Sequence, residues 1–234
     1  MAKKDPLKTY RGKRDFSRTP EPGSSPRQAG AKHSAARKPR RASKAARQPS
    51  EALRRRVFVV QLHDARRLHY DFRLEVEGTL KSWAVPKGPS MNPRNKHLAV
   101  MVEDHPLEYA AFEGVIPEDN YGAGAVIVWD GGVYENLRHD KKGHEVPMDE
   151  AIEQGHIVIR LHGRKLRGSF ALQRTGMVRG KSNWILIKMR DEFASEDYEP
   201  IDASGESILS GRTVEQVAKD AAEDERAVPK WRAA

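Results

Sequence analysis

Cysteine is absent from the 234 residues of the chain. The absence excludes disulfide bonds and metal sites that use thiolates. A bound metal ion would therefore have to be held by histidine, aspartate and glutamate side chains.

Long hydrophobic runs are also absent. No stretch of about 18 apolar residues occurs, which argues against a membrane-spanning helix. The first residues, MAKKDPLKTYRGKRDF, lack the apolar segment of a secretory signal. Only 38% of the residues are hydrophobic, so we expect part of the chain to lie outside any core. These features predict a cytoplasmic protein.

Charge is distributed unevenly along the chain. Residues 1–56 contain 18 Lys and Arg against 4 Asp and Glu, whereas residues 191–234 contain 12 acidic residues against 5 basic ones. A basic leading segment attracts DNA because neutralising phosphates releases counterions. We therefore predict association with the nucleoid, and a solvated tail that only aids solubility is the alternative.

The leading segment divides into two parts. Residues 22–56 are rich in Pro, Gly, Ala, Ser and basic side chains and predict a disordered linker. Residues 1–21 instead contain Leu7, Tyr10 and Phe16. These apolar side chains can dock on a folded body, so we expect an arm that lies over the active site.

Residues 57–190 consist of short β-like runs separated by turn signals. The runs predict an all-β fold, a small antiparallel barrel or sandwich, with one short helix over Met148–Gln154. A parallel α/β fold is disfavoured because crossover helices are missing. Residues 191–234 predict an acidic tail that is mostly disordered, with a loose helix over Val214–Arg226 as the alternative. The predicted strands are Val57–His63, Tyr70–Val76, Lys81–Val85, His97–Glu103, Ala125–Asp130, Gly132–Glu135, His156–Leu161, Gly168–Arg174 and Trp184–Arg190.

Two neighbouring runs carry the strongest chemical signal. Alternate strand residues share a face, so His69, Asp71 and Arg73 lie together opposite an apolar face. If the preceding run pairs with this one, His63 joins them. Two imidazoles and a carboxylate can hold a divalent metal. Arg73, on the same face, suits a phosphate because its guanidinium binds two oxygens at once.

A third run adds further polar groups. As one continuous strand, it places His97, Met101, Glu103 and His105 on one face. His105 can act as a general acid or stabilise charge on a phosphoryl group. Lys87, in a proline-flanked turn, is a candidate for another phosphate contact.

Long segments of the chain resemble a known family. The segments FVVQLHDARRLHYDFRLEVEGTLKSWAVPKGPS and LAVMVEDHPLEYAAFEGVIPEDNYGAGAVIVWD closely resemble the 3′-phosphoesterase domain of bacterial DNA ligase D. The resemblance implies a small manganese-binding β-barrel that removes a 3′-terminal ribonucleotide and then the remaining 3′-phosphate. A ligase can seal the resulting 3′-OH in non-homologous end joining.

Site roles are carried over from the family motif by motif. The resemblance implies metal ligation by His63, His69 and Asp71, and a phosphate-contacting and catalytic pair formed by Arg73 and His105. Manganese suits this set of ligands, with zinc or cobalt as possible substitutes. The positions matching supporting or contributing residues are Gln61, Lys87, Glu103 and Tyr109 in the domain and Arg14, Asp15 and Glu21 in the arm.

No polymerase region or ligase lysine motif accompanies these segments. We therefore expect a stand-alone, monomeric version that works on DNA 3′ ends with a separate ligase and polymerase and without a membrane. Two other functions stay open. A non-haem iron oxygenase would use His156 or His162 as a third ligand and Arg164 or Arg167 for an oxo-acid, and a non-catalytic DNA-binding module would need no chemistry.

Overall fold

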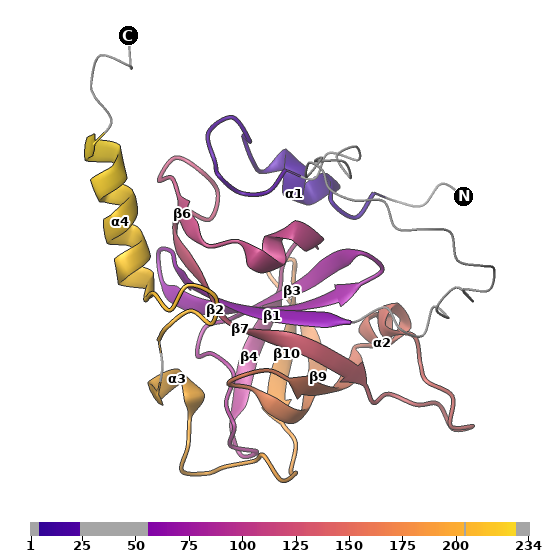
Figure 1. Cartoon of the computed structure of the whole chain (residues 1–234). Helices are drawn as coiled ribbons and strands as arrows, with labels where there is room; N and C mark the ends of the chain where they lie inside the picture. Colours follow the sequence, from indigo (N-terminus) through magenta and orange to yellow (C-terminus); the bar gives the residue numbers. More distant parts are fainter. Residues whose placement is uncertain (1–4, 24–55, 204, 228–234) are drawn as a thin grey trace, which may run out of the picture.

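The computed structural model describes residues 5–23, 56–203 and 205–227. Its centre is a closed antiparallel barrel of β1, β2, β3, β4, β10, β9, β8 and β7, in which β7 pairs back to β1 (Figure 1). The predicted all-β barrel is confirmed. The strands are β1 (Val57–Asp64), β2 (Leu68–Val76), β3 (Thr79–Val85), β4 (Lys96–Met101), β5 (His105–Pro106), β6 (Gly114–Ile116), β7 (Gly124–Asn136), β8 (His156–His162), β9 (Arg167–Val178) and β10 (Lys181–Lys188).

Each strand divides its side chains between the barrel interior and an outer layer. The interior is filled by a large apolar cluster that includes Trp83, Trp129 and Trp184, all fully buried. On the outside, Val59 and Leu80 belong to a second buried cluster with Tyr10 and other side chains. The outer layer is what covers the polar side chains of β1 and β2 and removes them from water.

One predicted turn is wrong. The sequence Asp130-Gly131-Gly132 was expected to separate two strands, but β7 runs through it as one strand. A side chain at Gly132 would collide with the backbone carbonyl of His162, and one at Gly131 would crowd the carbonyl of Phe58. These glycines therefore allow close approach of neighbouring strands instead of forming a turn.

The third predicted run is also not one strand. Met101 pairs with Trp83 and His105 pairs with Leu80, so three residues (102–104) face two on β3. This extra residue is a bulge, and a one-residue shift moves the following side chains to the opposite face. The predicted common face is therefore wrong: Met101 packs against the interior cluster, whereas His105 lies in the outer layer. His97 shares the face of Met101 on β4, opposite Leu186, and its Nδ1 lies 2.6 Å from the carbonyl of Gly88.

Short helices pack around the barrel. They are α1 (Lys8–Gly12), the 3-10 helix η2 (Leu107–Ala111), α2 (Met148–Gln154), which has the predicted bounds, α3 (Pro200–Ala203) and α4 (Val214–Ala227). Tyr10 of α1 is fully buried, and its ring lies edge-on to that of Tyr109 of η2 at 6.1 Å. Residues 5–23 thus dock onto the outer layer, while most of the linker predicted for residues 22–56 lies outside the described residues.

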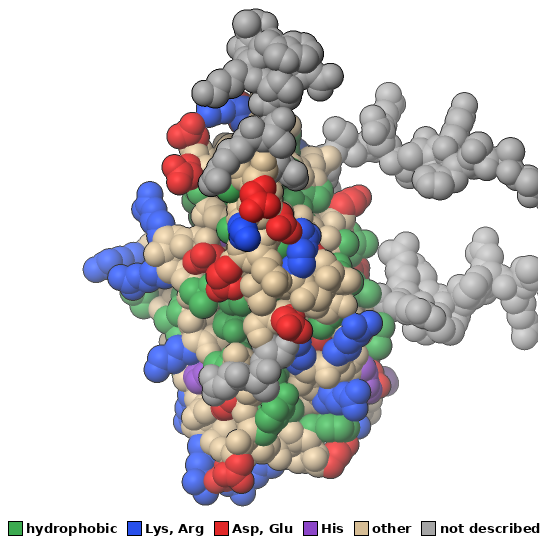
Figure 2. Space-filling view, turned by 60° about the vertical axis from the view of Figure 1, so that its left-hand side comes forward, with side chains coloured by type: hydrophobic (Ala, Val, Ile, Leu, Met, Phe, Trp, Pro, Cys, Tyr) green, Lys and Arg blue, Asp and Glu red, His purple; other side chains and the backbone are tan. Residues whose placement is uncertain are grey.

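The C-terminal part differs from a disordered tail. α4 lies beside β6 and β7 (Figure 1), and Val214 and Val217 are buried in the large apolar cluster. Two apolar side chains one turn apart are enough to seat an otherwise acidic helix, which composition alone did not reveal. Figure 2 brings this side forward and shows acidic side chains across its upper half. Among the described residues, no helix is long and apolar enough to span a membrane.

Candidate metal and phosphate site

The pairing of β1 with β2 brings three potential metal ligands together. His63 lies directly opposite His69, and Gln61 opposite Asp71. One ligand atom from each of His63, His69 and Asp71 lies within 4.8 Å of the others. The His63 Nδ1 and His69 Nε2 atoms are 3.6 and 3.7 Å from the Asp71 carboxylate oxygens.

The other nitrogen of each ring is held by a backbone carbonyl. His63 Nε2 donates to Gly122 at 2.8 Å, and His69 Nδ1 donates to Arg67 at 2.9 Å. Because a carbonyl only accepts, each bond fixes the tautomer and leaves the lone pair facing Asp71. This donor set, two imidazoles and one carboxylate, fits a divalent metal.

Asp71 is kept ionised in a buried setting. Burial alone would raise the pKa of its carboxyl group, but the charge of Arg73 and the two histidines more than offset it, so the pKa lies well below its usual value. Arg73 Nη2 donates to Asp71 at 3.0 Å. The carboxylate is therefore available as a ligand across the physiological pH range.

Arg73 is buried and bonded to several protein groups. Its side chain is 2% exposed, and it donates from Nε to Gln61 at 2.8 Å and from Nη1 to Ser82 at 2.8 Å, with His105 Nδ1 at 2.9 Å. Gln61 is in turn held by its amide nitrogen, which donates to the carbonyls of Tyr109 and Phe112. The guanidinium thus links the candidate ligand Asp71 to His105, and one N–H of Nη2 has no partner among the described residues.

His105 lies between two guanidinium groups. Burial and the charges of Arg73 and Arg14 hold its pKa well below the usual value. Its Nδ1 lies 2.9 Å from the Glu103 carbonyl, and its Nε2 lies 3.4 Å from Arg14 Nη2. In either neutral tautomer one ring nitrogen keeps a lone pair that faces a guanidinium. A second proton on the ring would take up that lone pair and place a positive charge beside the guanidinium. The resting ring is therefore neutral.

The N-terminal arm supplies the remaining wall of the site. Arg14 pairs with Glu21 at 2.8 Å and with Glu103 at 3.4 Å, and all three side chains are nearly buried. Tyr109 donates its hydroxyl to Glu21 at 3.0 Å, and Lys13 pairs with Glu103 at 3.1 Å. Burial would raise the pKa of Glu103, but a backbone hydrogen bond and both arm cations lower it overall. A charged network thus joins the arm to η2 and to the bulge before β5.

Two predicted residues lie apart from this network. Lys87 is exposed in the turn after β3, and within the described residues no hydrogen bond or ion pair joins it to the site. Asp15 is exposed and accepts hydrogen bonds from the amide and hydroxyl groups of Ser17. Their roles in activity stay predictions.

The structure places two residues at the site that the sequence analysis did not single out, Ser82 and Gly122, together with Tyr10, which was expected only to dock the arm. Ser82 bonds Arg73, Gly122 orients His63, and Tyr10 packs on the His105 ring at 5.0 Å between centroids. The alternation of β3 placed Ser82 on the same face as Ala84, but nothing in the sequence showed which strand would neighbour β2. The carbonyl of Gly122 carries no side-chain signal at all.

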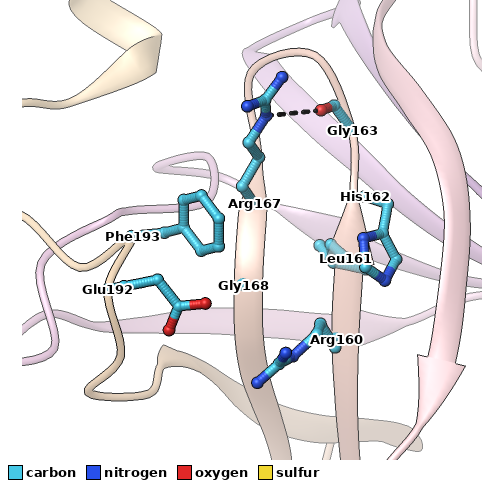
Figure 3. Close-up of a pocket in the computed structure, with 8 residues that line it drawn as sticks. All are labelled: Arg160, Leu161, His162, Gly163, Arg167, Gly168, Glu192 and Phe193. Atoms are coloured by element: carbon cyan, nitrogen blue, oxygen red, sulfur yellow. Dashed lines mark hydrogen bonds between the residues drawn. The ribbon is translucent and has the colours of Figure 1, made fainter.

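A pocket on another part of the barrel is lined by two of the residues named for the iron oxygenase alternative. Its lining includes His162 and Arg167, whose guanidinium donates to the Gly163 carbonyl (Figure 3). His162 bonds Glu135 at 2.8 Å. In the part of the chain that the structure describes, neither His162 nor His156 joins a cluster of metal ligands. The third ligand expected of the oxygenase alternative is therefore not at the candidate centre.

Comparison with known proteins agrees with the geometry. Residues 61–174, which contain the three ligands, Arg73 and His105, match the family described as the DNA Ligase D 3′-phosphoesterase domain. These residues belong to that family. The resemblance predicted from the sequence is confirmed.

Curated relatives extend the match beyond the phosphoesterase domain itself. The chain is 46% identical to the multifunctional non-homologous end joining protein LigD of Pseudomonas aeruginosa over 216 residues. This match covers 92% of the chain. It is 45% identical over 143 residues (61% of the chain) to LigD of Mycobacterium tuberculosis and 39% identical over 206 residues (87%) to that of Mycolicibacterium smegmatis. The chain spans 22%, 17% and 23% of the lengths of these relatives.

Proposed function

We propose that this protein is a metal-dependent phosphoesterase that heals DNA 3′ ends. It would remove a 3′-terminal ribonucleotide and then the 3′-phosphate, leaving a 3′-OH for ligation. The observation that carries the proposal is the cluster of His63, His69 and Asp71, joined through Arg73 to a neutral, buried His105. A ligand set next to a cationic pocket is what phosphoryl transfer needs.

The three ligands would hold the metal, which would neutralise a phosphate oxygen and orient the attacking group. Arg73 acts as a positioning residue, because its donors bind Asp71, Gln61 and Ser82. His105, neutral at rest, binds the phosphate or takes up a proton, and it can act as a general acid only after it has gained that proton. Arg14, 3.4 Å from the ring, adds positive charge on the side of His105 away from Arg73.

The proposed metal is chosen from the ligand chemistry. Manganese suits mixed imidazole and carboxylate ligands without thiolates, and we propose it as the native ion, with zinc and cobalt as substitutes. Lys87 and Asp15 are proposed as further contributors, the first through a phosphate contact. Glu21, Glu103 and Tyr109 would support Arg14.

The partners are proposed from the chemistry and the relatives. DNA 3′ ends are the substrate, and a separate ligase and polymerase of non-homologous end joining would use the healed end. The curated relatives are named as multifunctional end-joining proteins, which supports a place in double-strand break repair at the nucleoid.

A primer–template with one 3′-terminal ribonucleotide tests the proposal. With manganese, the wild type should release the ribonucleoside and then the phosphate, and His63→Ala should form neither product. His162→Ala is the matched control, since this exposed histidine lies outside the cluster, and it should match the wild type. An absence of product from the wild type with manganese, zinc and cobalt would contradict the proposal and favour a non-catalytic DNA-binding module.

A further inference from the structure

The β9–β10 hairpin projects from the barrel as a two-stranded ribbon. Pairing of β8 with β9 ends at Gln173, and pairing of β4 with β10 ends at Asn183. Apart from Arg174, which donates to the carbonyls of Gly155 and Glu153, residues 174–182 make their hydrogen bonds to described residues only within the hairpin. A two-stranded β-ribbon has the width to enter the major groove of DNA.

The tip of the ribbon carries an arginine in an unfavourable backbone conformation. Arg179 and Gly180 both have positive φ, 50° and 75°, as a two-residue hairpin turn requires. Asn, Asp or Gly is the favoured first residue of such a turn, whereas Arg there costs about 1 kcal/mol. The Arg179 side chain is exposed and makes no hydrogen bond or ion pair with the described residues.

Large apolar side chains flank the tip in water. Met177 and Val178 are 65% and 54% exposed, and Tyr121, across a groove, is 50% exposed. The groove, of about 450 Å³, is lined by Met177, Gly180 and Lys181 on one side and by Lys13 and Tyr121 on the other. Exposed apolar groups along one groove mark an interaction surface.

This groove leads to the candidate metal site. Tyr121 precedes Gly122, whose carbonyl holds His63. Lys13 Nζ lies 4.3 Å from the centroid of the Tyr121 ring and pairs with Glu103, which also lines the groove. A strand whose 3′ end reached the ligands would therefore pass between Tyr121 and the ribbon.

Two lysines, Lys13 and Lys181, balance two carboxylates in the lining of the groove, and further cations beside the groove make the surface positive. The two carboxylates, Glu103 and Asp104, are paired with Lys13 and Lys81, and Glu103 also with Arg14. Arg179 and Lys181 at the ribbon add two cations that no described acidic side chain pairs with. Phosphates favour such a surface because binding releases counterions.

We propose that the ribbon of residues 174–182, with Tyr121 and Lys13, holds the DNA duplex behind the 3′ end. Arg179 contacts a phosphate, and Met177 and Val178 pack against the sugars of a groove. The inference rests on the proposed function, since it assigns the duplex part of the same substrate.

The test uses Arg179→Asn in the full chain, because Asn is favoured at this turn position. The variant should melt at or above the wild-type temperature and yet bind DNA less tightly. With a short fluorescein-labelled duplex ending in a 3′-phosphate, in EDTA to prevent turnover, anisotropy should show about three- to tenfold weaker affinity, with a salt slope lower by about 1. Met177→Thr/Val178→Thr should weaken the affinity with an unchanged salt slope.

Glu77→Asn is the matched control. Glu77 also has positive φ before a glycine, in the β2–β3 hairpin, so its replacement changes an equivalent turn but no residue of the groove. It should leave DNA affinity unchanged. Turnover of a nucleoside 3′-phosphate, too small to reach the ribbon, should also be the same in Arg179→Asn and wild type.

The outcomes separate the two proposals. If the wild type processes the duplex but Arg179→Asn binds it with wild-type affinity and salt slope, the ribbon assignment is overturned and the proposed function stands. If the wild type neither binds nor processes the duplex, both are overturned. A partner protein as the true occupant would give the first of these results.

Discussion

At the scale of single residues, Arg73 connects most of the site. It bonds the candidate metal ligand Asp71 on its own strand, the Gln61 amide on β1, the Ser82 hydroxyl on β3 and the His105 imidazole on β5. Sequence reasoning placed Arg73 correctly beside Asp71 because the two residues are two apart on one strand. It assigned the guanidinium to the substrate, since the partners that occupy it come from distant parts of the chain.

Loss of Arg73 should therefore affect stability as well as activity. Arg73→Gln leaves the buried Asp71 carboxylate without its cation, and we expect the free energy of unfolding to fall by about 3 kcal/mol. Urea denaturation of the metal-free protein measures this change. Arg94→Gln, which breaks the exposed pair with Glu196, is the control and should cost less than about 1 kcal/mol. Equal effects of the two substitutions would contradict the central place of Arg73.

His105 should make stability depend on pH. Its pKa is depressed in the folded protein, so below about pH 6.5 the unfolded chain binds a proton that the folded chain does not. The free energy of unfolding should thus fall as pH decreases from 6.5. In His105→Gln this contribution is missing. Denaturation at a series of pH values should therefore show that the free energy of unfolding falls less in the variant than in the wild type below pH 6.5. A constant difference between them would contradict a depressed pKa.

At the scale of elements, the bulge at residues 102–104 determines which side chains reach the candidate site. It turns His105 outward while Met101 stays inside, and no residue type in Val102-Glu103-Asp104 signals an extra residue in the pairing. The alternation of β1 and β2 was predictable because both strands are regular and one of their faces is apolar. Long-range register and the contacts of the arm were not, since they depend on which elements become neighbours.

Phosphatase activity should depend on docking of the N-terminal arm. Tyr10→Ser removes a buried ring that packs on His105 and Tyr109, so Arg14 and Glu21 should leave the site while the barrel stays folded. We expect DNA 3′-phosphatase activity to fall at least about tenfold and hydrogen exchange to increase in the arm alone. Phe16→Ser, at a residue 37% exposed, should change both much less. Full activity of Tyr10→Ser would show that the arm is dispensable.

At the scale of the whole molecule, charge is separated along the chain. The basic excess lies in residues 1–56 and the acidic excess in residues 191–234. Composition showed this separation directly, but it did not show that α4 packs on the barrel, because two buried valines are too weak a pattern within an acidic segment.

The basic linker should tether the protein to DNA. Deleting residues 22–50 removes many cations, so DNA affinity should weaken and its dependence on salt should become less steep. Anisotropy titrations across a series of salt concentrations measure both. Unchanged affinity at every salt concentration would show that the linker serves only solubility.

The central claim is that His63, His69 and Asp71 hold the metal of a DNA 3′-end phosphoesterase, and a manganese titration tests it most directly. Isothermal calorimetry should find one strong manganese site per chain in the wild type and in His162→Ala. In His63→Ala the affinity should fall at least about a hundredfold, because one of three ligands is lost. Manganese binding of equal strength in His63→Ala and wild type would contradict the account.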